Sequence, residues 1–296
     1  MELNVASTAL LDKIEGIAPQ LAFSSLIAML RELDIESFGQ VLVSMPNQAY
    51  PAVSRLLPPM ASKELQTLIT GNHGANLLIQ SLAFIRAMRQ KYEQVKGSPL
   101  VGATILDFGC GYARLLRLML YFSDTDRLFC CDPAKSLIEG CHWLKLPFDL
   151  RVSDYLPTRL PYAPCMFDLI YAFSVFTHTS PRATRTALSA LRPIVKPDGM
   201  LVLTVRPIEY WNLLDVELRL AKTDSDRQRV TNEHLANGYA FLPNPRIELV
   251  QGEAVYGDGS MSIEFIEREF PAWKVLGTQS LPEDPYQQIV YLQPCA

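Results

Sequence analysis

The segment TILDFGCGYARLLR, residues 104–117, changes character midway along its length. Its first five residues predict a buried strand, Gly109 to Gly111 predict a tight turn, and Tyr112 begins a predicted helix with leucines on one face. In doubly wound α/β proteins such a strand–turn–helix unit binds a nucleotide, because the glycines let the ligand approach the backbone and the free N–H groups of the helix start face it. The segment therefore predicts a nucleotide site at one edge of a sheet.

The composition of the 296-residue chain is typical of a globular protein with a sizeable core, since 49% of the residues are hydrophobic and 20% are charged. The formal net charge is -4 and no run of Lys or Arg stands out, which argues against nucleic acid as a partner. The six cysteines include no C-x-x-C pair, the first residues lack the pattern of an export signal, and no apolar run is long enough to span a membrane. We therefore expect a cytoplasmic protein with reduced thiols and no nucleic-acid or membrane partner, and we leave self-association into an oligomer open.

Helical periodicity and proline positions divide the chain into two predicted parts. Residues 1–95 carry apolar residues at helical spacing, interrupted by prolines, and predict a helical cap or subdomain. Residues 96–296 begin with alternating strand and helix patterns, which favour a mainly parallel sheet covered on both faces. Further strands are expected at 128–131, 148–152, 167–173 and 200–205, with helices at 134–144 and 181–195.

The last third of the chain has a different pattern. Residues 208–222 predict a helix, whereas residues 232–256 are rich in Asn, Gly, Pro and aromatic residues and predict an irregular, partly strand-forming insertion within about 223–260. An irregular stretch of this length is typical of a lid or binding loop. The remaining predicted elements are a helix at 260–270 and two strands at 273–279 and 287–292, which a short connection makes antiparallel.

Two types of cofactor compete for the glycine turn. A dinucleotide fingerprint G-x-G-x-x-G/A requires a small residue at position 114, where the helix packs closely on the sheet, and this chain has Arg114. The chain instead has Asp107 two residues before the first glycine. A carboxylate inside an apolar strand is costly unless a partner compensates it, and a cationic ligand group beyond the strand end would do so. The turn therefore favours a cofactor that carries an amine over a nicotinamide dinucleotide.

With these residues the sequence resembles the class I S-adenosylmethionine-dependent methyltransferases. Their first motif, an acid followed by x-G-x-G-x-G, matches residues 107–113, with Ala113 in place of the third glycine. The resemblance covers about residues 100–206 and extends more loosely to residue 296. It implies an α/β, Rossmann-like fold whose seven-stranded sheet is mostly parallel, with an antiparallel strand near the C-terminus, preceded here by the helical cap.

The resemblance also implies a cofactor site at the ends of three consecutive strands. Asp107 would hold the methionine ammonium of S-adenosylmethionine or orient a water molecule, Asp132 would accept hydrogen bonds from the ribose hydroxyls, and Asp154 would meet the adenine amine. Each of these acids has a plainer alternative, because Asp107 could be a structural acid, Asp132 could cap a helix and Asp154 could be a turn residue. The cofactor contacts that we expect are Asp107, Phe108, Gly109, Cys110, Gly111, Tyr112, Asp132, Pro133, Ser153, Asp154, Tyr155 and Phe173.

Residues 173–180, FSVFTHTS, resemble the family segment that lies under the transferable methyl group, and Phe173 offers an aromatic face to a sulfonium. The segment lacks the Asn/Asp-Pro-Pro-aromatic motif of enzymes that methylate adenine or glutamine nitrogen. His178 is the candidate catalytic base for a hydroxyl acceptor, and the alternative is that it only hydrogen-bonds a loop backbone. The candidate acceptor contacts are His73, Arg206 and Tyr210, the last two of which could equally be packed at the start of the next helix.

These observations predict an S-adenosylmethionine-dependent enzyme that transfers methyl to a hydroxyl of a sugar or other small metabolite by in-line displacement. The alternatives are a carbon, nitrogen or lipid acceptor, or a methyltransferase-like binding protein without turnover. The sequence carries no Cys and His spacing of a zinc site and no recognisable acid pair for magnesium, so we expect no metal.

Overall fold

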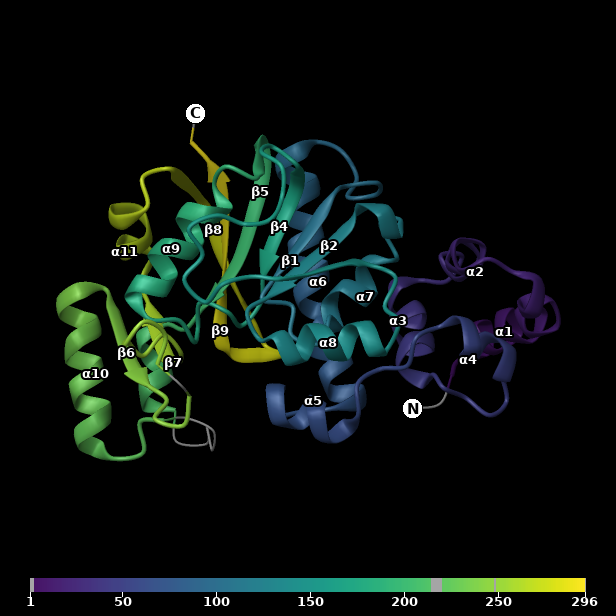
Figure 1. The fold of residues 1–296 in the computed structure, drawn as a ribbon, viewed down its shortest axis with the longest axis horizontal. Coiled ribbons are helices and arrows are strands. Elements are labelled where there is room, and N and C mark those ends of the chain that lie inside the picture. Colours follow the sequence, from purple (N-terminus) through teal and green to yellow (C-terminus); the bar gives the residue numbers. More distant parts are fainter. Residues whose placement is uncertain (1–2, 214–219, 248, 296) are drawn as a thin grey trace.

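A seven-stranded sheet forms the centre of the computed structural model, which describes residues 3–213, 220–247 and 249–295 (Figure 1). The strand order is β3-β2-β1-β4-β5-β9-β8. The strands β1 to β5 pair in parallel, whereas β9 runs antiparallel to both β5 and β8. The mostly parallel sheet with an antiparallel strand near the C-terminus is thereby confirmed. The strands are β1 (Ile105–Phe108), β2 (Leu128–Asp132), β3 (Asp149–Val152), β4 (Phe167–Ala172), β5 (Val195–Val205), β8 (Trp273–Leu281) and β9 (Asp284–Pro294).

Helices cover both faces of the sheet. Successive residues of a strand face opposite sides, so Ile105 belongs to one apolar core and its neighbour Leu106 to the other. Because both faces are buried at the centre of the sheet, β1, β2 and β4 are mainly apolar rather than alternating, as expected for parallel strands. The first core is covered by α6 (Gly74–Lys96), α7 (Arg114–Met119) and α8 (Lys135–Trp143), and the second by α9 (Pro181–Leu191) and α11 (Ile263–Glu269).

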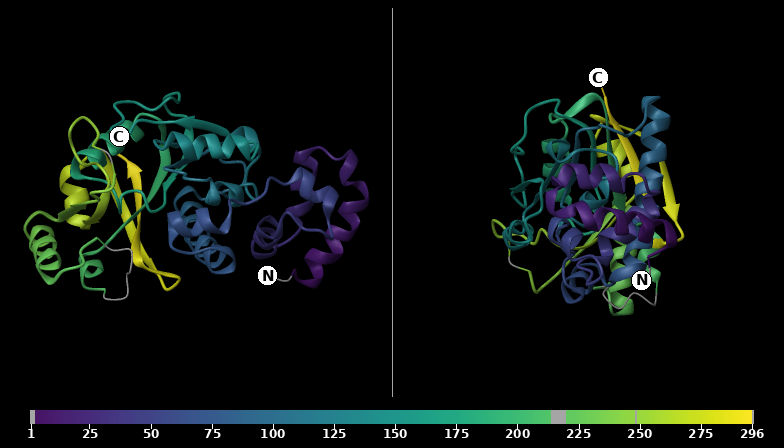
Figure 2. Two further views of the ribbon diagram at one scale, coloured as in Figure 1. Left: turned by 60° about the horizontal axis from the view of Figure 1, so that its bottom comes forward. Right: turned by 90° about the vertical axis from the view of Figure 1, so that its right-hand side faces the viewer.

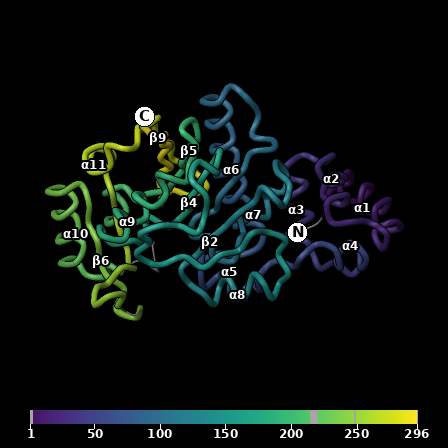
Figure 3. Tube along the Cα trace, turned by 45° about the horizontal axis from the view of Figure 1, so that its top comes forward, coloured from purple at the N-terminus to yellow at the C-terminus, as the bar shows by residue number. Residues whose placement is uncertain are grey.

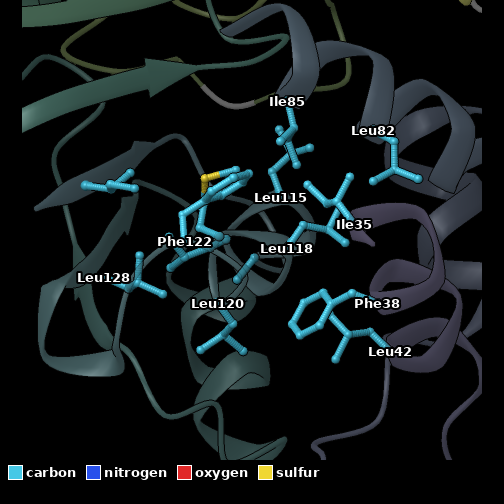
Figure 4. Close-up of a cluster of buried hydrophobic side chains, with 14 of the residues drawn as sticks. Ile35, Phe38, Leu42, Leu82, Ile85, Leu115, Leu118, Leu120, Phe122 and Leu128 are labelled. Atoms are coloured by element: carbon cyan, nitrogen blue, oxygen red, sulfur yellow. The ribbon is translucent and has the colours of Figure 1, made fainter. Parts of the chain in front are cut away.

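The helices between residues 5 and 56 form a lobe at one end of the molecule (Figure 2). Figure 4 shows Phe38 and Leu42 of this lobe gathered with Leu82 of α6 and Leu118 of α7. One apolar core runs from Leu11 in this lobe into the sheet. The helical N-terminal region is confirmed, whereas its separation from the rest at residue 95 stays a prediction. The elements of the lobe are α1 (Val5–Ile17), η1 (Ala18–Gln20), α2 (Phe23–Leu30), α3 (Ile35–Ser44) and α4 (Pro51–Leu56). The helix α5 (Lys63–Thr70) lies nearer the sheet, beside α8 (Figure 1).

The segment between β5 and α11 forms the opposite end of the molecule, where α10 and β6 lie far from α1 (Figures 1 and 3). The helix α10 (Asp224–Asn237) begins at Thr223, whose hydroxyl accepts the backbone N–H of Asp226, and ends at the left-handed Gly238. Behind it, β6 (Tyr239–Pro243) pairs antiparallel with β7 (Gly257–Met261).

Three sequence-based expectations for this region are wrong in detail. Residues 224–237 are helical rather than irregular, and the polar composition of α10, in which Val230 and His234 are its buried residues, explains why apolar periodicity did not reveal it. Residues 257–261 form a strand, so the expected helix at 260–270 begins only at Ile263. The expected helix at 208–222 is a 3₁₀ turn, η3 (Ile208–Asn212), and its positions 214–219 lie outside the described residues.

Candidate active site

The glycine turn between β1 and α7 requires backbone that side chains disfavour. Gly109, Gly111 and Ala113 all have positive φ, at 75°, 56° and 57°. A Cβ at Gly109 would lie 2.4 Å from Cγ2 of Val175, whereas a Cβ at Gly111 would meet no atom within 4 Å. The first glycine is therefore needed for packing against the loop after β4, and the second borders open space. The third position of the motif is left-handed even though it holds alanine.

Asp132 ties the turn to the end of β2. Its Oδ2 accepts the backbone N–H of Gly111 at 2.8 Å, and its Oδ1 accepts that of Ala134, beyond Pro133, at 2.8 Å. The side chain is buried, and burial raises the pKa of its carboxyl while the two backbone donors oppose the rise. Asp132 thus joins the end of β2 to the glycine turn after β1, and its role toward a ligand stays a prediction.

Asp107 lies one strand away and has no such donors. Burial raises the pKa of its carboxyl to about 7, and the Tyr171 hydroxyl and the Arg114 guanidinium oppose the rise. The carboxyl is 3% exposed and forms no hydrogen bond or ion pair with another described residue that meets standard geometry. A buried acid of this kind gains its charge when a cationic group is supplied from outside.

The end of β3 lies beside Asp132. The backbone N–H of Ser153 donates to the Asp132 carbonyl at 3.1 Å, and the Ser153 hydroxyl is buried without a hydrogen-bond partner among the described residues. A buried hydroxyl left unpaired is costly, which makes it a candidate ligand contact. Asp154 and Tyr155 follow it and are exposed.

The other expected cofactor contacts differ in exposure. Phe173, just after β4, is half-buried and meets Phe84 of α6 edge-on, with ring centroids 4.7 Å apart. Phe108 stacks on Phe176 at 6.4 Å within the second core. Cys110 is a buried free thiol whose pKa is raised well above its ordinary value by a neighbouring thiol and by burial, so it is not poised as a nucleophile.

Tyr112, the last of the expected contacts, is buried at the inner end of a surface recess between α5 and α8. The recess has a volume of about 390 Å³ and a mainly apolar lining. Trp143 at its rim is 81% exposed. The lining residues are Pro59, Met60, Ala61, Ser62, Leu65, Tyr112, Ser136, Leu137, Gly140, Trp143 and Leu144.

His178 has partners for both ring nitrogens. Its Nδ1 lies 2.7 Å from the Gly257 carbonyl oxygen, so Nδ1 carries the proton, and its Nε2 accepts from Nη2 of Arg206 at 3.2 Å. The ring stacks on Tyr256 with centroids 5.2 Å apart. Burial and the Arg206 charge lower the pKa of His178 to about 4, and Asp258 opposes the fall. The loop-backbone hydrogen bond that was the plainer alternative is therefore present, and the base role stays a prediction.

Arg206 and Tyr210 belong to a buried network rather than to an open surface. Asp258 accepts Nη1 of Arg206 at 2.7 Å through Oδ1, and it accepts the Tyr210 hydroxyl at 3.1 Å and the Leu220 N–H at 2.7 Å through Oδ2. The Arg206 guanidinium lies 4.1 Å from the Tyr210 ring centroid and also donates to the Thr177 carbonyl. The network joins the end of β5 to β7, and this packed arrangement is the alternative that the sequence left open.

His73 lies apart from that network, at the start of α6. Its side chain is exposed, and its Nδ1 lies 3.1 Å from the Thr67 hydroxyl of α5. The structure therefore brings together the cofactor candidates at the ends of β1, β2 and β3, and separately joins His178 with Arg206 and Tyr210.

Three charged residues at this edge were not identified as site residues from the sequence. They are Arg114, Asp258 and Asp284. Asp284 opens β9, is 3% exposed, and accepts Nε2 of Gln287 at 2.8 Å. Because Val205 pairs with Gln288, the turn before β9 lies at the carboxyl end of β5. Burial raises the pKa of Asp284 to about 6, with Arg114 and Arg206 opposing. In the sequence Asp284 lies in the short connection between the predicted strands 273–279 and 287–292, where an acid is not distinguished from an ordinary turn residue.

The described residues contain no group of three or more His, Cys, Asp or Glu side chains arranged to hold a metal ion. No helix within residues 3–213, 220–247 and 249–295 is long and apolar enough to cross a membrane.

Comparison with known proteins agrees with this geometry. Residues 105–199, about a third of the chain, match the model of a methyltransferase domain. An S-adenosylmethionine-dependent methyltransferase from Clostridium acetobutylicum ATCC 824 superposes with a TM-score of 0.50 at 12% identity, covering 79% of this chain and 97% of that one. This likeness shows the fold.

Other solved structures are similar at lower scores. Magnesium protoporphyrin IX methyltransferase from Synechocystis PCC 6803, with bound S-adenosylhomocysteine, has a TM-score of 0.48 at 13% identity, covering 78% of this chain and 94% of that one. A glycopeptide N-methyltransferase in complex with sinefungin has a TM-score of 0.46 at 10% identity, covering 71% and 86%.

The matched segment contains β1 to β4, the glycine turn, Asp107 and Asp132. The seven-stranded sheet with its antiparallel β9 is the fold expected from the resemblance. Residues 105–199 of the chain therefore match a methyltransferase domain, and the sheet as a whole has the fold of an S-adenosylmethionine-dependent methyltransferase.

Proposed function

We propose that this protein transfers a methyl group from S-adenosylmethionine to a hydroxyl of a sugar or other small metabolite. The observation that carries the cofactor part is the open face over Gly111, bordered by the Asp132 carboxylate and the unpaired Ser153 hydroxyl. The backbone at Gly111 is free of side chains, the Asp132 carboxylate is held by backbone donors, and the buried Ser153 hydroxyl has no partner among the described residues. Together these features suit a ligand with hydroxyls, an amine and a purine.

In this proposal each strand end binds one part of the cofactor. Asp107 takes the ammonium, which offsets the cost of burying its carboxylate, and Asp132 takes the ribose hydroxyls while it holds the turn through Gly111. Ser153 donates to the adenine, with Asp154 and Tyr155 at its solvent side. The cofactor supplies an activated methyl group, and the protein aligns the acceptor with it in line.

The acceptor side of the proposal depends on His178. Its Nε2 is the ring nitrogen that can take a proton, because Nδ1 donates to Gly257. A hydroxyl that reaches Nε2 must displace Nη2 of Arg206, and the lowered pKa makes the imidazole neutral at physiological pH but a weak base. Phe173, the exposed His73 and the Arg206–Tyr210 pair are the remaining acceptor-side candidates.

Cofactor binding is tested by calorimetry with S-adenosylhomocysteine on the full chain. We expect binding by the wild type and a large loss of affinity for Asp132→Ala. The matched control is Asp126→Ala, which removes an exposed acid before the same strand, at the opposite edge of the sheet. No heat for the wild type, or equal affinity of both variants, would contradict the proposal.

The acceptor class is tested with labelled S-adenosylmethionine and a panel of sugars, hydroxylated metabolites, amines and lipids. Label in a hydroxylated small molecule supports the proposal, whereas label only in an amine, carbon or lipid acceptor replaces its acceptor part. No transfer to any acceptor by a protein that binds the cofactor favours a binding protein without turnover. His178→Gln then tests the base, since unchanged turnover across pH would remove His178 from the reaction.

A further inference from the structure

Arg114 is a half-buried arginine that has no role in the proposed function so far. It is the first residue of α7, directly after the left-handed Ala113. Its Nη1 donates to the Ser81 hydroxyl of α6, and its guanidinium lies 5.3 Å from the ring centroid of Phe173. The side chain therefore extends from the glycine turn across the end of β4 to α6.

The guanidinium has few partners for its five N–H donors. In the described part of the chain its hydrogen bond to Ser81 is the one formed, and no carboxylate lies within 4.0 Å. Asp107 and Asp284 are close enough to act on it electrostatically without forming an ion pair. Burial lowers the pKa of Arg114, which reflects the cost of keeping a cation in this place without a contacting anion.

Another arginine of the same helix shows the contrast. Arg117 is 3% exposed, and its two terminal nitrogens donate to the carbonyls of Pro58 and Pro59 at 2.7 and 2.6 Å. Arg117 thus fastens the N-terminal lobe to α7. Arg114 has no comparable set of fixed acceptors and lies beside the open face of the turn, near Phe173.

We propose that Arg114 binds the carboxylate of the amino-acid part of the cofactor, while Asp107 takes its ammonium. The inference rests on the proposed function. Asp107 and Arg114 stand on opposite sides of the glycine turn, carry opposite charges and do not pair with each other. This separation suits a zwitterion that lies between them, and a planar guanidinium can bind a carboxylate through two parallel hydrogen bonds.

The competing role for Arg114 is electrostatic support of Asp284. Asp284 already accepts Gln287, and its raised pKa of about 6 makes its carboxyl easier to neutralise than an ordinary aspartate. If Arg114 served only Asp284, its loss would weaken every cofactor analogue equally. If it binds the ligand carboxylate, its loss would matter only for ligands that carry one.

The experiment compares S-adenosylhomocysteine with its decarboxylated analogue, which keeps the amine. Calorimetry on the wild type should show a preference for the carboxylate of roughly 10- to 100-fold, the range of hydrogen bonds to a charged group. Arg114→Met should abolish the preference while affinity for the decarboxylated analogue changes little. Arg117→Lys, the matched control, should keep it.

Two further variants decide the matter if Arg114→Met does not fold. Arg114→Lys keeps the charge without the planar fork and should retain only part of the preference. Ser81→Ala releases the anchor of Arg114 and should reduce the preference as well. A wild-type preference that survives all of these changes overturns the inference but leaves the proposed function intact. A wild type that binds neither ligand contradicts the proposed function itself.

Discussion

The two glycines of the turn should respond differently to the same substitution. Alanine at Gly109 would meet Val175 at 2.4 Å, whereas alanine at Gly111 would meet nothing within 4 Å. Both positions have positive φ, so both substitutions carry the same conformational cost. The difference between them isolates the packing contact at the first position from the ligand contact that we propose at the second.

The expected loss of stability is the sum of a backbone conformational cost and, at Gly109 alone, a packing cost. Left-handed backbone costs a non-glycine residue about 1–2 kcal/mol, and the lower unfolded-state entropy of alanine offsets about 0.4–1 kcal/mol. Gly111→Ala should therefore destabilise the protein by about 1 kcal/mol. Gly109→Ala also places a methyl group in a space that is already filled, which should cost about 1–3 kcal/mol more. The total destabilisation should be about 2–4 kcal/mol.

Urea unfolding measures both free energies, and calorimetry with S-adenosylhomocysteine measures the ligand effect. We expect Gly111→Ala to lose about tenfold or more in affinity despite its smaller effect on stability, since one methyl group would occupy the open face. Val175→Ala should rescue part of the Gly109→Ala loss in a double-mutant cycle. Equal destabilisation by the two substitutions, or a coupling of zero with Val175→Ala, would refute the reasoning.

Four smaller predictions follow from single contacts. Ala113→Gly should raise the free energy of unfolding in urea by up to about 1 kcal/mol, because φ there is 57°. The Kd for S-adenosylhomocysteine should fall as pH rises toward 7, where the Asp107 carboxyl ionises, and calorimetry should show a flat profile for Asp107→Asn. Because the pKa of His178 is lowered to about 4, wild-type stability should be lost as pH falls from about 6.5 toward 4, and thermal melts of His178→Gln should lose less. Asp258→Ala should destabilise the fold by about 3–5 kcal/mol in urea unfolding, since it strands the Arg206 charge, whereas Asp226→Ala on exposed α10 should cost far less.

The sequence predicted the sheet well because its strands are apolar, short and separated by clear turn signals. The order in which acids follow β1, β2 and β3 could also be predicted, since the ends of parallel strands share one edge. The hydrogen bond from Gly111 to Asp132 is a direct consequence of that register. What periodicity could not reveal was α10, because a helix with two buried side chains has almost no apolar stripe.

Side-chain partners at the acceptor edge were beyond the sequence for a physical reason. His178 meets Gly257, and Arg206 meets Asp258, across separations of 79 and 52 residues. Such contacts depend on how β7 lies against the loop after β4, and nothing local in FSVFTHTS specifies it. The same holds for Arg114, whose anchor Ser81 lies on a helix 33 residues earlier.

The Arg206 contacts also constrain how an acceptor hydroxyl can reach His178. Arg206 donates to Asp258, to the Thr177 carbonyl and to Nε2 of His178, so moving it away from the imidazole strains a buried ion pair. The hydrogen bond to Nε2 is the longest of the three, at 3.2 Å against 2.9 and 2.7 Å, and its acceptor is a neutral imidazole nitrogen rather than a carboxylate. We therefore expect the hydrogen bond between Arg206 and His178 to break before the other two. In the proposed reaction an acceptor hydroxyl would replace it while Arg206 keeps Asp258, so the position of Asp258 would determine how easily the acceptor reaches the proposed base.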